Sequence, residues 1–144
     1  MIRVYIIISF LFLILNSCST LKKEVVECPK LISTKKAAEI VVNSEGNSPV
    51  YLGFRGVQKF CFKDGDDIEM ELSVNVRAIR NDITKEDYVP VNISVVSVDL
   101  NEKEFDRDEF NYSQFLLKGS KMVDRATTFE LKVPTGGQVL LGIK

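Results

Sequence analysis

The chain begins with an apolar run of limited length. Residues 4–15 are apolar with one exception and follow a short positive stretch that ends at Arg3. A membrane-spanning helix needs about 20 apolar residues, and this run stops after twelve. A positive start, a short apolar run and a small polar boundary, here Asn16 and Ser17, are typical of a secretory signal. We therefore expect residues 1–17 to be cleaved from the mature protein.

Beyond a short polar segment, the pattern changes to the alternation of β-strands. The clearest segment is 68–78, in which apolar and polar residues alternate strictly. A period of two indicates a strand with one buried face. Residues 60–63 alternate in the same way, and Asp64 and Gly65 after them supply the pair that a tight hairpin needs. We therefore expect Cys61 on a strand that leads into a hairpin.

The same period recurs towards the end of the chain. Residues 127–133 alternate, and the turn residues at 134–137 precede a last apolar segment at 139–143. Weaker strand signals lie at 37–42, 50–54 and 103–112. About seven short strands without a convincing helix predict an all-β fold, an immunoglobulin-like antiparallel β-sandwich.

Two segments depart from a simple alternation. The apolar phase slips between Val95 and Val96, which predicts a β-bulge or a strand that crosses from one sheet to the other. Residues 118–126 have no clear period, so we expect a loop or a helical turn there.

The length of 144 residues, with 27% charged and 45% hydrophobic residues, fits one folded domain behind the signal. We assign residues 18–27 to an anchor and tether and residues 28–144 to the sandwich. The signal holds only one of the 19 lysines and arginines and none of the 20 acids, so the mature part is slightly acidic. A basic face for DNA or RNA is not expected.

The residues at the end of the signal have a recognisable order. Leu15, Asn16, Ser17 and Cys18 resemble the bacterial lipobox. The resemblance implies a diacylglyceryl thioether on Cys18, often with a third acyl chain on its amine, and two or three chains hold a protein durably on a membrane. In well-studied Gram-negative bacteria an aspartate after this cysteine retains the lipoprotein in the inner membrane. Because Ser19 stands there, we expect the outer membrane, facing the periplasm.

The chain has three cysteines. If Cys18 carries lipid, Cys28 and Cys61 remain in a compartment where disulfides persist, and we expect them to pair. A metal site is the alternative use, but the chain has no histidine to complete the usual zinc set. Pro29 follows Cys28 and lacks an N–H donor, so we expect this segment at a sheet edge or outside the sheets.

The order of these features resembles a family of small, uncharacterised lipoproteins of α-proteobacteria. The lipobox is followed by Cys28 and Pro29, then by Cys61 between two phenylalanines, by alternating strands, and by a Val-Pro before the final strand. The resemblance implies a β-sandwich in the cell envelope and adds no activity.

The composition argues against an enzyme. The absence of histidine and tryptophan removes the commonest general base, the commonest metal ligand and the usual indole platform for sugars. Asp64, Asp66 and Asp67 could bind calcium, but a hairpin turn is the favoured reading. The acidic stretch 102–109 is interpreted as a solvated strand face, with a hydrolytic carboxylate pair as the lesser alternative. We therefore assign no catalytic residue, metal or cofactor.

The leading hypothesis is a non-enzymatic envelope module that is anchored to a lipid membrane through Cys18 and binds or scaffolds an envelope protein. The alternative is a small-ligand or lipid carrier with a pocket between its sheets. Seven aromatic residues could serve the core or a partner, and we expect most of them in the core: Tyr51, Phe54, Tyr88, Phe105, Phe110, Tyr112 and Phe115.

Overall fold

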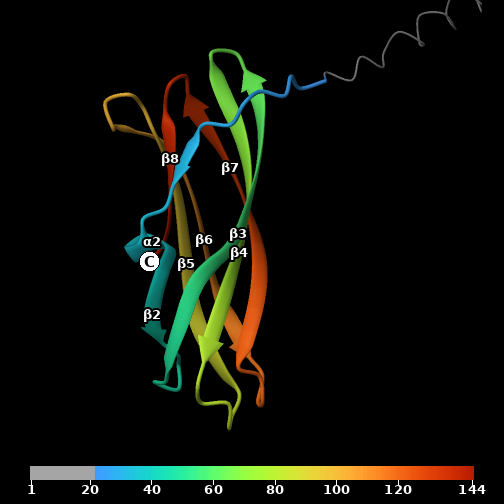
Figure 1. The fold of residues 1–144 in the computed structure, drawn as a ribbon, viewed down its shortest axis with the longest axis vertical. Coiled ribbons are helices and arrows are strands. Elements are labelled where there is room, and N and C mark those ends of the chain that lie inside the picture. The colour runs from blue at the N-terminus through green and yellow to red at the C-terminus, as the bar shows by residue number, and fades with distance from the viewer. Residues whose placement is uncertain (1–21) are drawn as a thin grey trace, which may run out of the picture.

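Two four-stranded sheets pack face to face in the computed structural model, which describes residues 22–144 (Figure 1). The elements are β1 (Lys30–Ile32), α2 (Lys35–Ala38), β2 (Glu39–Asn43), β3 (Pro49–Asp64), β4 (Asp67–Arg80), β5 (Asp87–Val98), β6 (Glu104–Leu116), β7 (Met122–Pro134) and β8 (Gln138–Ile143). Sheet A has the order β2-β3-β4-β7 and sheet B the order β1-β8-β5-β6. The predicted all-β sandwich is confirmed, with eight strands and one short helix in the described residues.

The core lies between the two sheets, where the alternating positions of each strand meet. On β4 the inward residues Met70, Leu72 and Val74 are buried, and Phe129 of β7 packs among them. Each large side chain removed from water in this way contributes about 1.5–3 kcal/mol. The period of two in 68–78 therefore reports the burial of one face of β4, as predicted.

β3 is longer than its apolar pattern suggested. The predicted strands at 50–54 and 60–63 are parts of one strand of 16 residues, which passes through a register shift between Phe54 and Gly56. The pattern broke off because the middle of β3 has no core contact: residues 55–60 are all exposed. At its end Asp64 pairs with Asp67 across the predicted hairpin turn, with Gly65 at φ 61°.

The irregularity predicted between Val95 and Val96 lies elsewhere on the strand. β5 keeps one phase through Ser97, and the register shift with β6 falls between Ser97 and Val98. The apolar pattern misled because Ser97 is a buried polar residue that donates a hydrogen bond to the Lys132 carbonyl at 2.6 Å, whereas Val96 faces outward. A bulge, one of the two predicted causes, is thus present two residues further along.

Two other segments differ from their patterns. The predicted strand at 37–42 begins with the helical turn α2 and becomes β2 only at Glu39. The segment 118–126 is a loop that passes into β7 at Met122. No helix within residues 22–144 has the length and apolar character to cross a membrane.

Candidate functional site

The disulfide predicted between Cys28 and Cys61 is present, with the two Cα atoms 5.2 Å apart. Cys61 is buried on β3, and the backbone N–H of Val26 donates to its carbonyl at 3.0 Å. Residues 30–32 then form β1 at the edge of sheet B. The segment around Pro29 therefore runs along the edges of the sheets, as expected. Cys18 lies outside the described residues.

The end of the predicted tether also contacts sheet A. Lys23 Nζ donates to both carboxylate oxygens of Glu69, at 2.8 and 3.0 Å, and lies 5.4 Å from the centre of the Phe62 ring. The Lys63 N–H donates to the Glu24 carbonyl at 2.8 Å. The chain is thus fixed to the sheet from Lys23 onward.

The middle of β3 has a free edge between two segments that pair with it. β2 pairs with β3 only as far as Gly53, and residues 24–26 reach it only from Cys61 onward. Figure 1 shows β2 beside the lower end of β3 and the N-terminal segment at its upper end. Between them residues 55–60 are all exposed. We call residues 55–60 the open edge.

The direction of the backbone groups at the open edge follows from the pairs at its upper end. The Cys61 carbonyl and the Lys63 N–H point away from β4, because they bond to the N-terminal segment. In an antiparallel ladder alternate residues point both of their backbone groups to the same side. The N–H and C=O groups of Val57 and Lys59 therefore point away from β4 as well, towards solvent.

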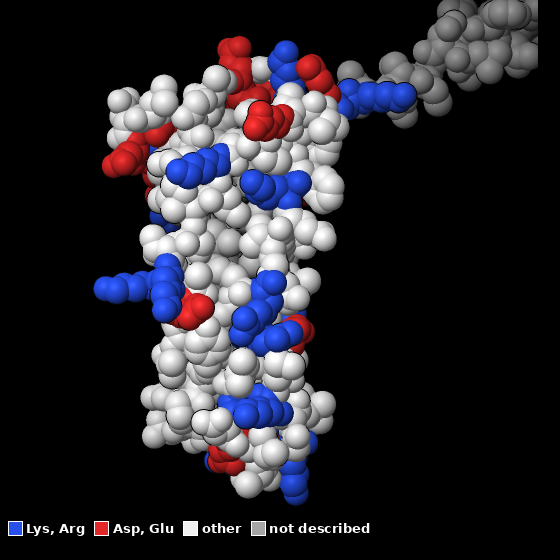
Figure 2. Space-filling view, in the orientation of Figure 1, with Lys and Arg blue, Asp and Glu red and all other residues white. Residues whose placement is uncertain are grey.

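The open edge carries two positive charges that form no close ion pair within residues 22–144, although Asp124, whose pKa is lowered first by Arg77, also feels the charge of Arg55. Neither Arg55 nor Lys59 lies within 4.0 Å of a carboxylate in residues 22–144, whereas Lys23, Arg77 and Lys132 all do. Figure 2 shows that acidic side chains gather near the upper end of this face of the molecule, while basic ones predominate further down. The strand edge itself therefore attracts negative charge, whereas Glu71 and Glu130 are acidic neighbours of Phe60 on the outer face of sheet A.

A shallow groove adjoins the open edge on the outer face of sheet A. Two hollows, of about 250 and 480 Å³, share Ser73 of β4 in their linings. Phe60, 58% exposed, borders the first, and Gly56 and Gln58 border the second. The other described hollows also lie on the surface of sheet A or along β7, and core side chains fill the space between the sheets.

The opposite edge of sheet A is closed by side chains. Asp106 and Asp108 of β6 accept hydrogen bonds from the backbone N–H groups of Lys132 and Glu130, at 2.7 and 3.1 Å. Lower on β7, Arg125 lies over the Tyr112 ring at 4.2 Å. β7 is therefore covered along much of its length, in contrast to the middle of β3.

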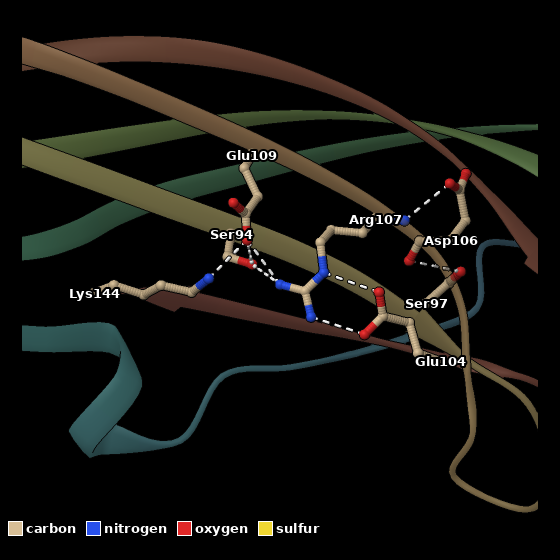
Figure 3. A network of polar contacts seen from close by, with 7 residues as sticks. All are labelled: Ser94, Ser97, Glu104, Asp106, Arg107, Glu109 and Lys144. Carbon is tan, nitrogen blue, oxygen red and sulfur yellow. Dashed lines mark hydrogen bonds and ion pairs between the residues drawn. The ribbon is translucent and has the colours of Figure 1, made fainter.

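Glu104 and Glu109 of the acidic stretch 102–109 belong to an ion-pair network on the outer face of sheet B (Figure 3), whereas Asp106 and Asp108 bond to β7. Arg107 bonds to Glu104 and to Glu109, and Lys144 bonds to Glu109 at 2.7 Å. The bonds from Lys144 and Arg107 lower the pKa of Glu109 to about 2, and Arg107 also lowers the pKa of Glu104. A general acid needs a raised pKa, and the pKa values of Glu104 and Glu109 are shifted in the opposite direction.

The aspartates of the β3–β4 hairpin take part in the turn and in an ion pair. Asp64 pairs with Lys132 at 3.0 Å, next to the turn that Asp66 and Asp67 complete. In the part of the chain that the structure describes, no group of three or more histidine, cysteine, aspartate or glutamate side chains could hold a metal ion.

The expectation that most of the seven candidate aromatics lie in the core is wrong. Among residues 22–144 the fully buried aromatic residue is Phe129, whereas Phe54 and Tyr112 are only partly buried against the core. Tyr88, Phe105 and Phe110 are exposed. These aromatics lie on or near strand edges and outer faces, where periodicity alone cannot distinguish a buried from an exposed position.

Sequence reasoning missed two buried charged residues at the lower end of the sandwich. The Arg80 guanidinium donates to the carbonyls of Leu116, Leu117, Ser120 and Lys85. Asp87 accepts from the Ser44 hydroxyl and from the Gly46 N–H, and these bonds lower its pKa. The alternation of β4, extended by two residues beyond Ala78, would have placed Arg80 on the buried face.

An apolar row also crosses the lower part of the outer face of sheet A. Val41, Tyr51, Ile79 and Met122 are cross-strand neighbours on four successive strands. Val41 is 66% and Met122 49% exposed. The row is a second exposed surface, and it lies at the end of the molecule opposite the β3–β4 hairpin.

No protein family, curated protein or solved structure matches the chain. The resemblance to small lipoproteins of α-proteobacteria stays a prediction from the sequence.

Proposed function

We propose that the chain is a lipid-anchored lipoprotein of a bacterial envelope, whose β-sandwich binds or scaffolds another envelope component without catalysing a reaction. The cysteines carry the proposal. Two of the three are joined in a disulfide, a bond typical of exported proteins, and the third is Cys18, directly behind the predicted signal of residues 1–17. One feature thus supports the compartment and the other supports the anchor.

The binding role rests on the surface rather than on a pocket. A free strand edge with unpaired backbone groups is a template for pairing with another chain. The middle of β3 offers such an edge next to an exposed phenylalanine. The two hollows beside the open edge lie on the outer face of sheet A, so they do not support the carrier alternative.

The anchor is tested by labelling cells with radioactive palmitate. The wild-type chain should take up label and shorten by the length of residues 1–17, whereas Cys18→Ser should remain an unlabelled precursor. Cys28→Ser/Cys61→Ser serves as the matched control and should still be labelled. Persistent label on Cys18→Ser would exclude Cys18 as the lipid site.

The location follows from Ser19 and is tested separately. Density-gradient fractionation should place the mature protein with the outer membrane, and protease should reach it only after the outer membrane is opened. Recovery wholly with the inner membrane would contradict the outer-membrane assignment while leaving the anchor itself in place.

A further inference from the structure

We propose that the open edge of β3 binds an extended acidic peptide segment of a partner protein, which adds as a strand to sheet A between β2 and the N-terminal segment. This inference rests on the proposed binding role and specifies its partner. Its basis is the free backbone of residues 55–60, the unpaired charges of Arg55 and Lys59, and the exposed Phe60 beside them.

The space at the edge fits a strand of a few residues. Six exposed residues at about 3.3 Å each leave about 20 Å of free edge. Glu39 of β2 bounds this stretch below, and Val26 bounds it above. The outward-pointing N–H and C=O groups of Val57 and Lys59 would supply the hydrogen bonds, as in other complexes formed by strand addition.

The side chains around the edge specify the peptide. Lys59 pairs with the buried Leu72, so its side chain leaves β3 on the inner side of the sheet. Phe60 leaves β3 on the outer side, where it is exposed. An added strand alternates its own side chains between the same two sides. A segment that alternates acidic with apolar residues would place acids near Lys59 and apolar groups near Phe60.

The same charges argue against a second copy of this chain as the occupant. If two open edges paired antiparallel about Val57, Arg55 of each copy would lie opposite Lys59 of the other. Like charges directly opposite one another destabilise a strand pair. The bulge between Phe54 and Gly56 limits regular strand pairing to the stretch from Gly56 to Phe60.

The test uses the full chain, purified from the envelope in detergent, with two synthetic octapeptides that alternate valine with glutamate or valine with lysine. In the free protein the amides of Val57 and Lys59 should exchange with deuterium rapidly and those of Gln58 and Phe60 slowly, because the latter face β4. The glutamate peptide should slow exchange at Val57 and Lys59 at least tenfold, and the lysine peptide should not.

Charge-reversal variants distinguish specific binding at the open edge from attraction by the net charge of the protein. Arg55→Glu/Lys59→Glu should weaken binding of the glutamate peptide at least tenfold and should gain binding of the lysine peptide. Lys103→Glu/Lys121→Glu makes the same change of net charge at exposed positions elsewhere and should bind as the wild type does. Binding that both double variants weaken equally, or no protection by the glutamate peptide, would overturn the proposal.

A crosslinking experiment distinguishes failure of this inference from failure of the proposed function. A photo-reactive amino acid is placed at Gln58 on the open edge or at Met122 on the apolar row, in cells that make the lipidated protein. The inference requires a partner crosslinked from Gln58 whose attached segment is acidic. A partner trapped only from Met122 would refute the inference and leave the binding role intact, whereas no partner from either position would count against both.

Discussion

The buried guanidinium of Arg80 donates hydrogen bonds to backbone carbonyl groups. Arg80 is 4% exposed. Its guanidinium bonds to the carbonyl of Lys85 and to three carbonyls in residues 116–120. Burial of a cation is unfavourable unless its donors are satisfied, and here each bond also fixes a loop. Arg80 therefore holds together the two connections at the lower end of the sandwich.

Arg80→Met should lower the free energy of unfolding by roughly 3 kcal/mol, because it leaves several buried carbonyls without a donor. Urea denaturation followed by circular dichroism measures the change. Arg77→Met is the control on the same strand: Arg77 pairs with Asp124 at the surface, and exposed pairs contribute little. Equal effects of the two substitutions would contradict the role assigned to Arg80.

The ion pairs of Glu109 should make the stability of the fold depend on pH. Its pKa is lowered from 4.5 to about 2, first by Lys144 and then by Arg107. A carboxyl whose pKa is lower in the folded state stabilises that state above its unfolded pKa, and loses the effect as the pH falls towards its folded pKa. The contribution should thus be complete at pH 7 and decline between about 4.5 and 2.

The carboxyl carbon of Glu109, followed by NMR, should accordingly titrate well below 4.5, the usual pKa of a glutamate. The difference in Tm between wild type and Glu109→Gln should shrink over the same pH range. Arg107→Gln should move the titration of Glu109 upward. A titration midpoint near 4.5 in the wild type would show that the ion pairs do not form in solution.

Among the elements, the segment 24–32 depends most on a single bond. Its backbone pairs through one isolated bridge and a three-residue strand, Val26 and Leu31 pack against the core, and the disulfide joins it to the buried Cys61. Cys28→Ser/Cys61→Ser should therefore lower the free energy of unfolding by about 2–5 kcal/mol. Addition of a reductant to the wild type should reproduce the loss and leave the double variant unchanged.

The two long edges of sheet A differ in how far their backbone groups are shielded from pairing with another chain. The N–H groups of Glu130 and Lys132 on β7 are bonded to Asp108 and Asp106. Asp106→Ala/Asp108→Ala should speed deuterium exchange at both amides and increase aggregation, because the variant exposes a second strand edge. Asp106→Asn/Asp108→Asn keeps an acceptor oxygen and should stay close to wild type. Unchanged exchange in the alanine variant would show that these side chains do not cap the edge.

How well the sequence predicted each element depended on its contact with the core. The alternation in 68–78 marked β4 because one face of that strand is buried throughout. The middle of β3 gave no signal, because its six residues contact no core, and so the open edge could not be predicted. The disulfide could be predicted from the number of cysteines. The bulge was predicted two residues too early, because the buried residue Ser97 is polar and interrupts the apolar pattern.

At the scale of the whole molecule, the long strands define a long axis, and the N-terminal segment enters at one end of it (Figure 1). The described chain enters near the β3–β4 hairpin, and the loops after β2, β4 and β6 lie at the other end (Figure 1). The 16 residues of β3 span about 50 Å at ~3.3 Å each. From Cys18 to Lys23, which is fixed to Glu69, an extended chain reaches at most about 18 Å. A protein anchored at Cys18 should therefore hold its hairpin end near the bilayer.

This orientation can be measured with an unnatural amino acid that carries a fluorophore, placed at Asp66 in the hairpin or at Asn47 in the loop after β2. Lipids that carry a quencher on the headgroup should quench the fluorophore at Asp66 strongly and that at Asn47 weakly, because the two positions lie at opposite ends of β3. A chain without residues 1–18, which has neither the signal nor the lipid, should show no quenching at either position. Equal quenching at the two positions would mean that the sandwich lies flat on the bilayer. An upright sandwich would leave the open edge of β3 at mid-height, accessible from the side to a partner in the surrounding space.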